Sequence, residues 1–194
     1  MSYEAKNFDV LLGVAGFSDQ LLKNHFTLYQ GYVTNTNKLA DALMIWAKEG
    51  KTGTPEYAEL KRRFGWEFNG MRLHELYFGN MAKIGTALDG KSQIVQRLNE
   101  RFGSYENWEK DFKATGGMRG IGWVILYEDS VNNRLFNVWV NEHDMGHLAG
   151  ANPLLVLDVF EHAYTLDYGL KKIDYIEAFM KALDWEIVAG RMKS

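Results

Sequence analysis

Residues 153 to 168 read PLLVLDVFEHAYTLDY, and this stretch decides how the rest of the chain is interpreted. It begins as an apolar run typical of a buried strand, and the run ends at an acid, Asp158. His162 follows four residues later. Because an unpaired buried carboxylate costs several kcal/mol, Asp158 must be paired, protonated or bound to a metal ion. A metal ion explains this carboxylate most directly.

The segments before this strand predict the rest of a small sheet and a helical N-terminal half. Residues 122 to 141 contain two β-rich runs joined by SVNN, which is the pattern of a β-hairpin. Residues 18 to 49 have apolar side chains at helical spacing, with Ser18 or Asp19 as the cap. A second helix is expected over roughly 55 to 83, interrupted or bent near Gly65 and Gly70. Two shorter helices are expected within 87 to 117, and one helix over 174 to 190.

These elements predict an α+β fold in two parts. Residues 1–89 are expected to form an N-terminal domain built on a long α-hairpin. Residues 90–194 are expected to form a C-terminal domain, in which helices surround a small three-stranded antiparallel sheet. A metal site is expected between the two domains.

Composition excludes several classes of function. The 194 residues include no cysteine, which removes disulfides, thiolate metal sites, iron–sulfur clusters and thiol nucleophiles. The net charge of −3 gives no indication of nucleic-acid or anionic-membrane binding. Neither a signal peptide nor an apolar run long enough to span a membrane is evident, so we expect a cytoplasmic protein.

Four side chains are candidate metal ligands. His25 and His74 lie on apolar faces of the two long predicted helices, and Asp158 and His162 close the predicted strand. A lone histidine on an apolar face is more often a hydrogen-bonded core residue than a ligand. Three neutral imidazoles and one carboxylate would suit Fe, Mn or Zn, and Ca or Mg poorly. The spacing alone does not show that the four converge.

Four blocks of the sequence resemble the iron/manganese superoxide dismutases. They are NHFTLYQGYVTNTNKL at 24–39, FNGMRLHELYFGNM at 68–81, GIGWVILY at 120–127 and LDVFEHAYTLDY at 157–168. The last block is close to the D-x-W-E-H-A-Y pattern of that family and is the most specific. The resemblance runs from about residue 18 to residue 190.

The resemblance implies a role for several residues. The metal ligands would be His25, His74, Asp158 and His162. The catalytic residues would be Tyr32, as a gateway tyrosine, and His143, as the donor near the metal-bound solvent that other members supply as glutamine. The pocket wall would be Trp123, Phe78 and Phe160. Glu161 would bridge to the partner of a homodimer or tetramer, Lys172 would line the access funnel, and His147 would be structural.

The implied function is disproportionation of superoxide at one redox-active metal ion per subunit, with iron favoured and manganese possible. Several residues depart from the family pattern: Tyr29 and Gln30 stand where a His-His pair is usual, and Lys172 replaces an arginine. Two other functions remain open from the residues alone. One is a non-haem iron oxygenase, and the other is a non-catalytic relative that binds metal or serves as a scaffold.

Overall fold

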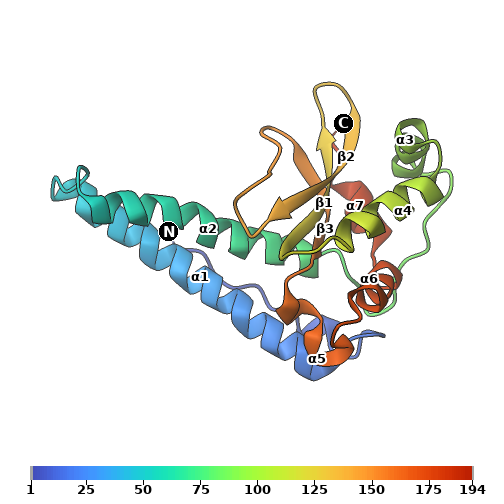
Figure 1. The fold of residues 1–194 in the computed structure, drawn as a ribbon, viewed down its shortest axis with the longest axis horizontal. Coiled ribbons are helices and arrows are strands. Elements are labelled where there is room, and N and C mark those ends of the chain that lie inside the picture. Colours follow the sequence, from blue (N-terminus) through green and yellow to red (C-terminus); the bar gives the residue numbers. More distant parts are fainter. Residues whose placement is uncertain (1, 194) are drawn as a thin grey trace.

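The computed structural model describes residues 2–193 and shows a long helical hairpin joined to a compact α+β part (Figure 1). The main helices are α1 (Asp19–Lys48), α2 (Pro55–Phe78), α3 (Gln93–Phe102), α4 (Tyr105–Gly116), α5 (Thr165–Tyr168), α6 (Lys172–Lys181) and α7 (Trp185–Gly190). The strands are β1 (Gly122–Asp129), β2 (Arg134–Asn141) and β3 (Asn152–Asp158). The α+β class, the helical hairpin and the three-stranded antiparallel sheet are therefore confirmed.

The two hairpin helices begin at capping residues that the sequence provides. The Ser18 side chain accepts a hydrogen bond from the Leu21 N–H at 3.0 Å, and Thr54 caps α2 just before Pro55. The predicted interruption of α2 is wrong, because the helix is continuous through Gly65 and Gly70. A glycine inside a helix costs only about 1 kcal/mol, so packing against α1 is enough to keep the helix intact.

Helix α2 ends at Phe78, five residues earlier than predicted, because the chain beyond it joins the C-terminal part. The Asn80 side chain donates to the Val156 carbonyl of β3 at 2.6 Å, and Met81 forms a β-bridge with Leu183. These contacts place the end of α2 directly beside β3. The C-terminal ends of both elements carry candidate ligands, which this contact brings together.

The sheet has the order β2-β1-β3, with both neighbours antiparallel to β1. As the central strand, β1 is buried from Gly122 to Glu128. Its register pairs Trp123 with Asp158, so the acid that ends β3 lies opposite a buried indole. The predicted hairpin over 122 to 141 is confirmed.

The single C-terminal helix predicted over 174 to 190 is wrong, because the structure has two helices, α6 and α7. The Asp184 carboxylate accepts from the N–H groups of Glu186 and Ile187 and thus starts a new helix. The Asp184 N–H donates to the Asn80 carbonyl at 2.7 Å, which fixes the break against the end of α2. No helix within residues 2–193 has the length and apolar character needed to cross a membrane.

Candidate metal centre

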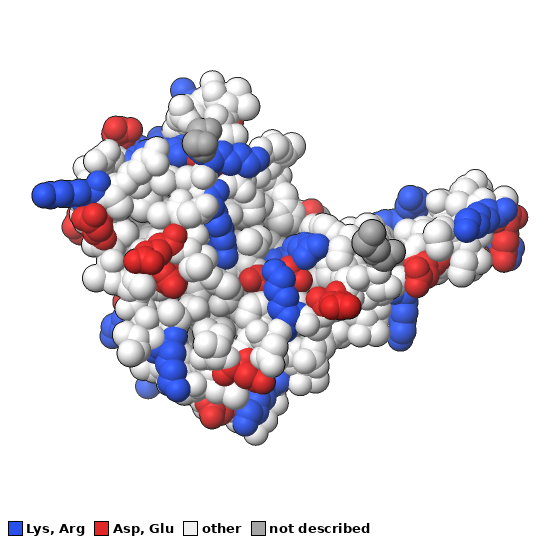
Figure 2. All heavy atoms as spheres, turned by 180° about the vertical axis from the view of Figure 1, so that it is seen from behind, with Lys and Arg blue, Asp and Glu red and all other residues white. Residues whose placement is uncertain are grey.

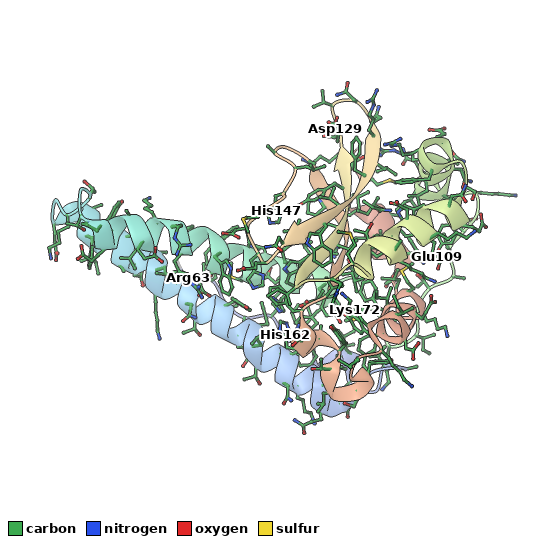
Figure 3. The ribbon with its side chains drawn as sticks, in the orientation of Figure 1. Arg63, Glu109, Asp129, His147, His162 and Lys172 are labelled. Carbon is green, nitrogen blue, oxygen red and sulfur yellow. The ribbon has the colours of Figure 1, made fainter. Side chains whose placement is uncertain are left out.

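His25, His74, Asp158 and His162 converge on one point where the helical hairpin meets the sheet. Their ligand atoms all lie within 4.8 Å of one another. Asp158 Oδ2 is 3.2 Å from His25 Nε2, 3.2 Å from His162 Nε2 and 3.6 Å from His74 Nε2. Figure 3 shows His162 between α1 and the end of β3. The three regions of sequence that the resemblance connects are therefore adjacent in space.

Backbone contacts hold the Asp158 carboxylate in place. Oδ1 accepts a hydrogen bond from the Phe160 N–H at 2.8 Å, which turns Oδ2 toward the three imidazoles. The Asp158 carbonyl accepts from the Tyr175 hydroxyl at 2.7 Å, and that hydroxyl lies 3.1 Å from the Tyr77 hydroxyl. Both tyrosines are fully buried. The end of β3 is thus fixed from α6 and α2, two elements that sequence patterns do not connect with it.

His74 shows most directly that this site needs a cation. Its Nδ1–H donates to the Gly70 carbonyl at 2.6 Å, so its Nε2 carries a lone pair in the neutral ring. That Nε2 is buried and has no hydrogen-bond partner within residues 2–193. Burial lowers the pKa of His74 well below its usual value, and the charge on His25 lowers it further. A buried lone pair aimed at a carboxylate oxygen without an intervening proton is the arrangement of a metal site.

The protonation states of the other candidate ligands agree with metal binding. Burial lowers the pKa of His25, although its hydrogen bond with Asp158 opposes the shift. Burial alone would raise the pKa of Asp158, but His162 and His25 hold it below its usual range. Neutral imidazoles and an ionised carboxylate are the forms that bind metals. The residues therefore fit one Fe or Mn ion, for which this nitrogen and oxygen donor set is suitable.

Aromatic rings enclose the cluster. The Phe78 ring meets His25 edge-on with centroids 4.9 Å apart, and Trp123 meets His74 edge-on at 5.0 Å. Phe160 stacks on His162 at 5.3 Å and on His143 at 4.8 Å. All three predicted wall residues thus contact ligand imidazoles.

Tyr32, His143 and Trp123 form a hydrogen-bonded chain next to the cluster. The Trp123 Nε1–H donates to His143 Nδ1 at 3.0 Å. Because an indole can only donate, the proton of neutral His143 lies on Nε2, which is 2.8 Å from the Tyr32 hydroxyl oxygen. Burial lowers the pKa of His143 to about 4 and so keeps the ring neutral. His143 therefore donates to Tyr32, whose own proton is left free to point into the pocket.

Gly70 makes room for this chain. A Cβ at this position would lie 2.6 Å from Cδ1 of Tyr32 and 2.8 Å from its Cε1. Any side chain at residue 70 would displace the tyrosine ring, which stacks on His74 at 5.0 Å. The donor near Tyr32 thus comes from residue 143 in this chain.

Sequence reasoning missed Trp66, which lies against Tyr32 and His143, and Arg63, which lies over Trp66. The Trp66 ring lies 4.3 Å from His143 and 5.6 Å from Tyr32, and its indole N–H donates to Glu142 at 3.2 Å. The Arg63 guanidinium lies 3.8 Å above the Trp66 ring and pairs with buried Glu67 at 2.6 Å. The spacing from Trp66 to His74, two helical turns along α2, was the available signal.

Lys172 and Glu161 occupy different surroundings from the cluster. The Lys172 ammonium donates to the Met118 carbonyl at 2.6 Å and lies 5.9 Å from the Trp139 ring. Within residues 2–193, no hydrogen bond or ion pair connects it with the four candidate ligands. Glu161 is exposed beside the cluster, at the start of the short 3₁₀ turn Glu161–Ala163 that carries His162.

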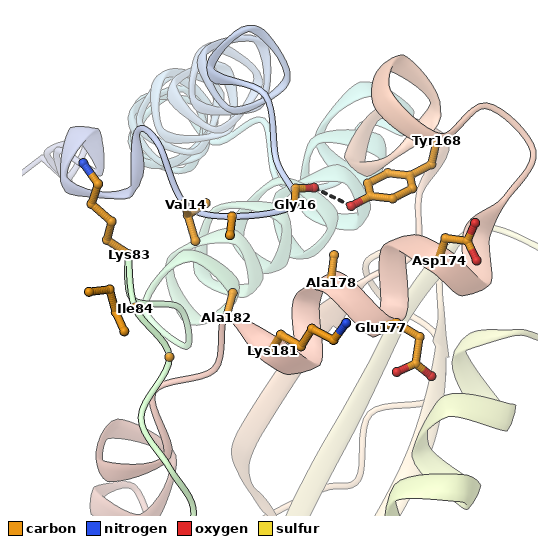
Figure 4. Close-up of a pocket in the computed structure, with 12 residues that line it drawn as sticks. Val14, Gly16, Lys83, Ile84, Tyr168, Asp174, Glu177, Ala178, Lys181 and Ala182 are labelled. Atoms are coloured by element: carbon orange, nitrogen blue, oxygen red, sulfur yellow. Dashed lines mark hydrogen bonds between the residues drawn. The ribbon is translucent and has the colours of Figure 1, made fainter.

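Among residues 2–193, no other group of three or more histidine, aspartate or glutamate side chains could hold a metal ion. A cavity of about 770 Å³ lies between residues 14–16, residues 83–85 and α6, and none of the four candidate ligands lines it (Figure 4). On the face in Figure 2, acidic and basic side chains are interspersed, and no broad area of that face carries one sign.

Comparisons with known proteins agree with this geometry. The family model of the iron/manganese superoxide dismutases, C-terminal domain, matches residues 90–191. The chain is 38% identical to superoxide dismutase [Mn] 2 of Haloferax volcanii over 175 residues, and the matched region covers 90% of this chain and 86% of that protein. It is 36% identical over 186 residues to superoxide dismutase [Fe] of Cupriavidus metallidurans, covering 92% and 89%. With superoxide dismutase [Fe] of Aquifex aeolicus, identity is 33% over 183 residues, covering 92% and 85%. The chain belongs to the iron/manganese superoxide dismutase family.

Proposed function

We propose that His25, His74, Asp158 and His162 hold one iron ion, and that Tyr32 and His143 manage the protons of superoxide disproportionation at this site. The observation that carries the proposal is the buried, unpartnered Nε2 of His74, aimed at the same point as Asp158 Oδ2. When bound, the ion supplies the change between +2 and +3 by which one superoxide is oxidised to O₂ and another is reduced. The reduced one takes up two protons and leaves as H₂O₂.

The protein residues provide proton delivery and exclusion of bulk water. Because His143 donates to the Tyr32 oxygen, the Tyr32 hydroxyl can donate to an anion in the pocket. Burial raises the pKa of Tyr32, and the negative charge of Asp158 raises it further, so the hydroxyl keeps its proton at neutral pH. The rings of Phe78, Phe160 and Trp123 pack around the imidazoles and keep bulk water from them.

Arg63 is a better candidate than Lys172 for attracting the anionic substrate. Its guanidinium lies over Trp66, whose ring contacts Tyr32 and His143, and its side chain is 45% exposed. A cation at the mouth of a site raises the association rate of an anion, and salt weakens this effect. Lys172, by contrast, is engaged with Met118.

The preference for iron over manganese rests on His143, which stands where the resemblance places a histidine in some iron enzymes of the family. Affinity alone does not decide between the two metals, because selectivity depends on site geometry and on metal supply. Relatives carry both metals in their names, so the family leaves the choice open. The test is metal analysis of protein purified from its native host, with superoxide consumption measured on the same sample and on iron- and manganese-reconstituted protein. Activity with manganese alone would contradict the iron assignment. Bound metal without turnover would favour a non-catalytic relative, and consumption of an organic co-substrate would favour an oxygenase.

The remaining parts of the proposal concern assembly and location. Glu161 is exposed beside His162, which supports its role as a bridge to the partner in a homodimer or tetramer. Sedimentation of the wild type and of Glu161→Gln would test this, since a weakened assembly is expected only if Glu161 crosses the interface.

The domain boundary at residues 89 and 90 is supported by the start of the family-model match at residue 90. Cell fractionation would test the cytoplasmic location.

A further inference from the structure

We propose that His147 is a positioning residue that orients His143 by holding its backbone carbonyl from the side of β1. The sequence suggests only a structural histidine at this position, whereas the hydrogen bonds connect His147 through His143 to Tyr32. The effect of this connection on turnover rests on the proposed roles of His143 and Tyr32, but the hydrogen bonds themselves do not depend on those roles.

His147 is held between a donor and an acceptor that together fix its tautomer. Its Nε2 lies 2.9 Å from the His143 carbonyl oxygen, which can only accept, so Nε2 carries the proton. Its Nδ1 then accepts from the Tyr127 hydroxyl at 2.6 Å. The hydrogen bonds therefore run in one direction, from Tyr127 through His147 to the carbonyl of His143.

The imidazole of His147 also contacts α2 of the helical hairpin. The side-chain amide nitrogen of Asn69 lies 3.4 Å from His147 Nε2, and because both nitrogens carry protons this is a packing contact without a hydrogen bond. Asn69 directly precedes Gly70, whose carbonyl holds His74. Figure 3 shows His147 in the loop between β2 and β3, beside α2. His147 is thus in contact with β1, α2 and the loop that carries His143.

Other contacts hold the residues beside His143, since the Glu142 N–H donates to the Ile121 carbonyl at 3.2 Å and the Glu142 carboxylate accepts from Trp66, but the His143 carbonyl accepts from His147. Glu142 has a φ of +49°, a conformation that costs non-glycine residues energy, and Asp144, Met145 and Gly146 are exposed. Asn141 and Met145 pair across the turn, with the Asn141 N–H donating to the Met145 carbonyl at 2.8 Å. That pairing fixes the two ends of the turn but leaves the carbonyl of residue 143 to His147.

The orientation of this peptide bears directly on the side chain. His143 must place Nδ1 at 3.0 Å from the indole of Trp123 and Nε2 at 2.8 Å from Tyr32 at the same time. A rotation of the peptide at residue 143 would lengthen at least one of these bonds, because the ring is rigid. Loss of the His147 contact should therefore weaken the hydrogen bond to Tyr32 without removing any group that touches the metal ligands.

Three variants test this inference. His147→Leu removes both hydrogen bonds, and His147→Gln keeps an N–H near the Nε2 position that can donate to the His143 carbonyl. Tyr127→Phe removes only the donor to Nδ1. Leu148→Ala, in the exposed neighbour of His147, is the matched control.

The first readout is the ¹⁵N spectrum of the imidazoles in metal-free protein, which reports which ring nitrogen of His143 carries the proton. In the wild type, in His147→Gln and in Leu148→Ala, we expect one signal set with the proton on Nε2. In His147→Leu we expect exchange between tautomers or a shift of the Nε2–H signal. An unchanged His143 spectrum in His147→Leu, or equal disturbance in His147→Gln, would overturn the inference. Should His147→Leu not fold, Tyr127→Phe carries the test, with a smaller shift expected and no shift overturning it.

The second readout is kcat per bound metal ion in reconstituted enzyme. Residues that support the partners of a metal site typically change activity by about 10- to 100-fold, and His147 is one step further away, so a fall of roughly 3- to 10-fold is expected for His147→Leu. Recovery to within about twofold is expected for His147→Gln, on the same grounds. A shifted His143 spectrum with unchanged kcat would show that the positioning link exists and that the proposed role of His143 in turnover is wrong.

Discussion

Substitution of Gly70 by alanine tests whether the position of the Tyr32 ring depends on the missing side chain at residue 70. The new Cβ would lie 2.6 Å, 2.8 Å and 3.0 Å from Cδ1, Cε1 and Cγ of Tyr32, so the ring must move. Replacing glycine by alanine within a helix by itself stabilises by about 1 kcal/mol. Overpacking of a filled interior costs about 1–3 kcal/mol. We therefore expect Gly70→Ala to lower the free energy of unfolding by about 0–2 kcal/mol.

Gly65, in the same helix, gives a matched control. Nothing lies within 4 Å of a Cβ built there, so Gly65→Ala should raise the free energy of unfolding by up to about 1 kcal/mol. Urea denaturation of metal-free protein should thus separate the two variants by about 1–3 kcal/mol, the sum of the two effects.

Activity distinguishes this steric effect from a general loss of stability. Displacement of Tyr32 breaks its 2.8 Å contact with His143, and a positioned proton donor contributes about 10²- to 10⁴-fold to a rate. We expect Gly70→Ala to lose at least about tenfold in kcat per bound metal, and Gly65→Ala to lose none. Equal stabilisation by both alanines with wild-type activity would refute the close packing of Tyr32 on residue 70.

Three further predictions concern the groups around the cluster. Burial lowers the pKa of His143 to about 4, so between that pH and about 6.5 unfolding takes up a proton at this residue. The free energy of unfolding should therefore fall by up to about 3 kcal/mol as the pH falls through this range. In denaturant titrations of metal-free protein, His143→Gln should show a flatter dependence on pH, and the same pH dependence in both proteins would contradict the lowered pKa. Trp123→Phe removes the donor to His143 Nδ1 and should lower kcat roughly tenfold, and stopped-flow superoxide decay at the wild-type rate would disprove its role. In the wild type, Fe²⁺ or Mn²⁺ at 1,000 times its Kd should raise Tm by an amount that corresponds to about 4 kcal/mol of stabilisation. Asp158→Asn should abolish this rise, and a Tm shift equal to that of the wild type would exclude Asp158 as a ligand.

Local sequence patterns predicted most of the secondary structure correctly. Ser18 marked the start of α1, and the alternation around SVNN marked the β-hairpin, because capping and turn chemistry act within a few residues. The errors lie where distant contacts decide. Helix α2 stops at Phe78 because the residues after it pair with β3 and Leu183, and Asp184 divides the C-terminal helix because it also bonds to Asn80.

The sequence by itself determined which groups the site uses: an acid at the end of a buried strand must be paired, protonated or bound to a metal ion, and the matching motifs supply three imidazoles. Only the tertiary structure decided that these groups meet, that His143 donates a hydrogen bond to Tyr32, and that Trp66, Arg63 and His147 lie around this pair. The physical reason is that periodicity and capping report forces within one element, whereas ligand convergence and tautomers depend on hydrogen bonds between elements more than a hundred residues apart in the chain, such as the one between His143 and Tyr32.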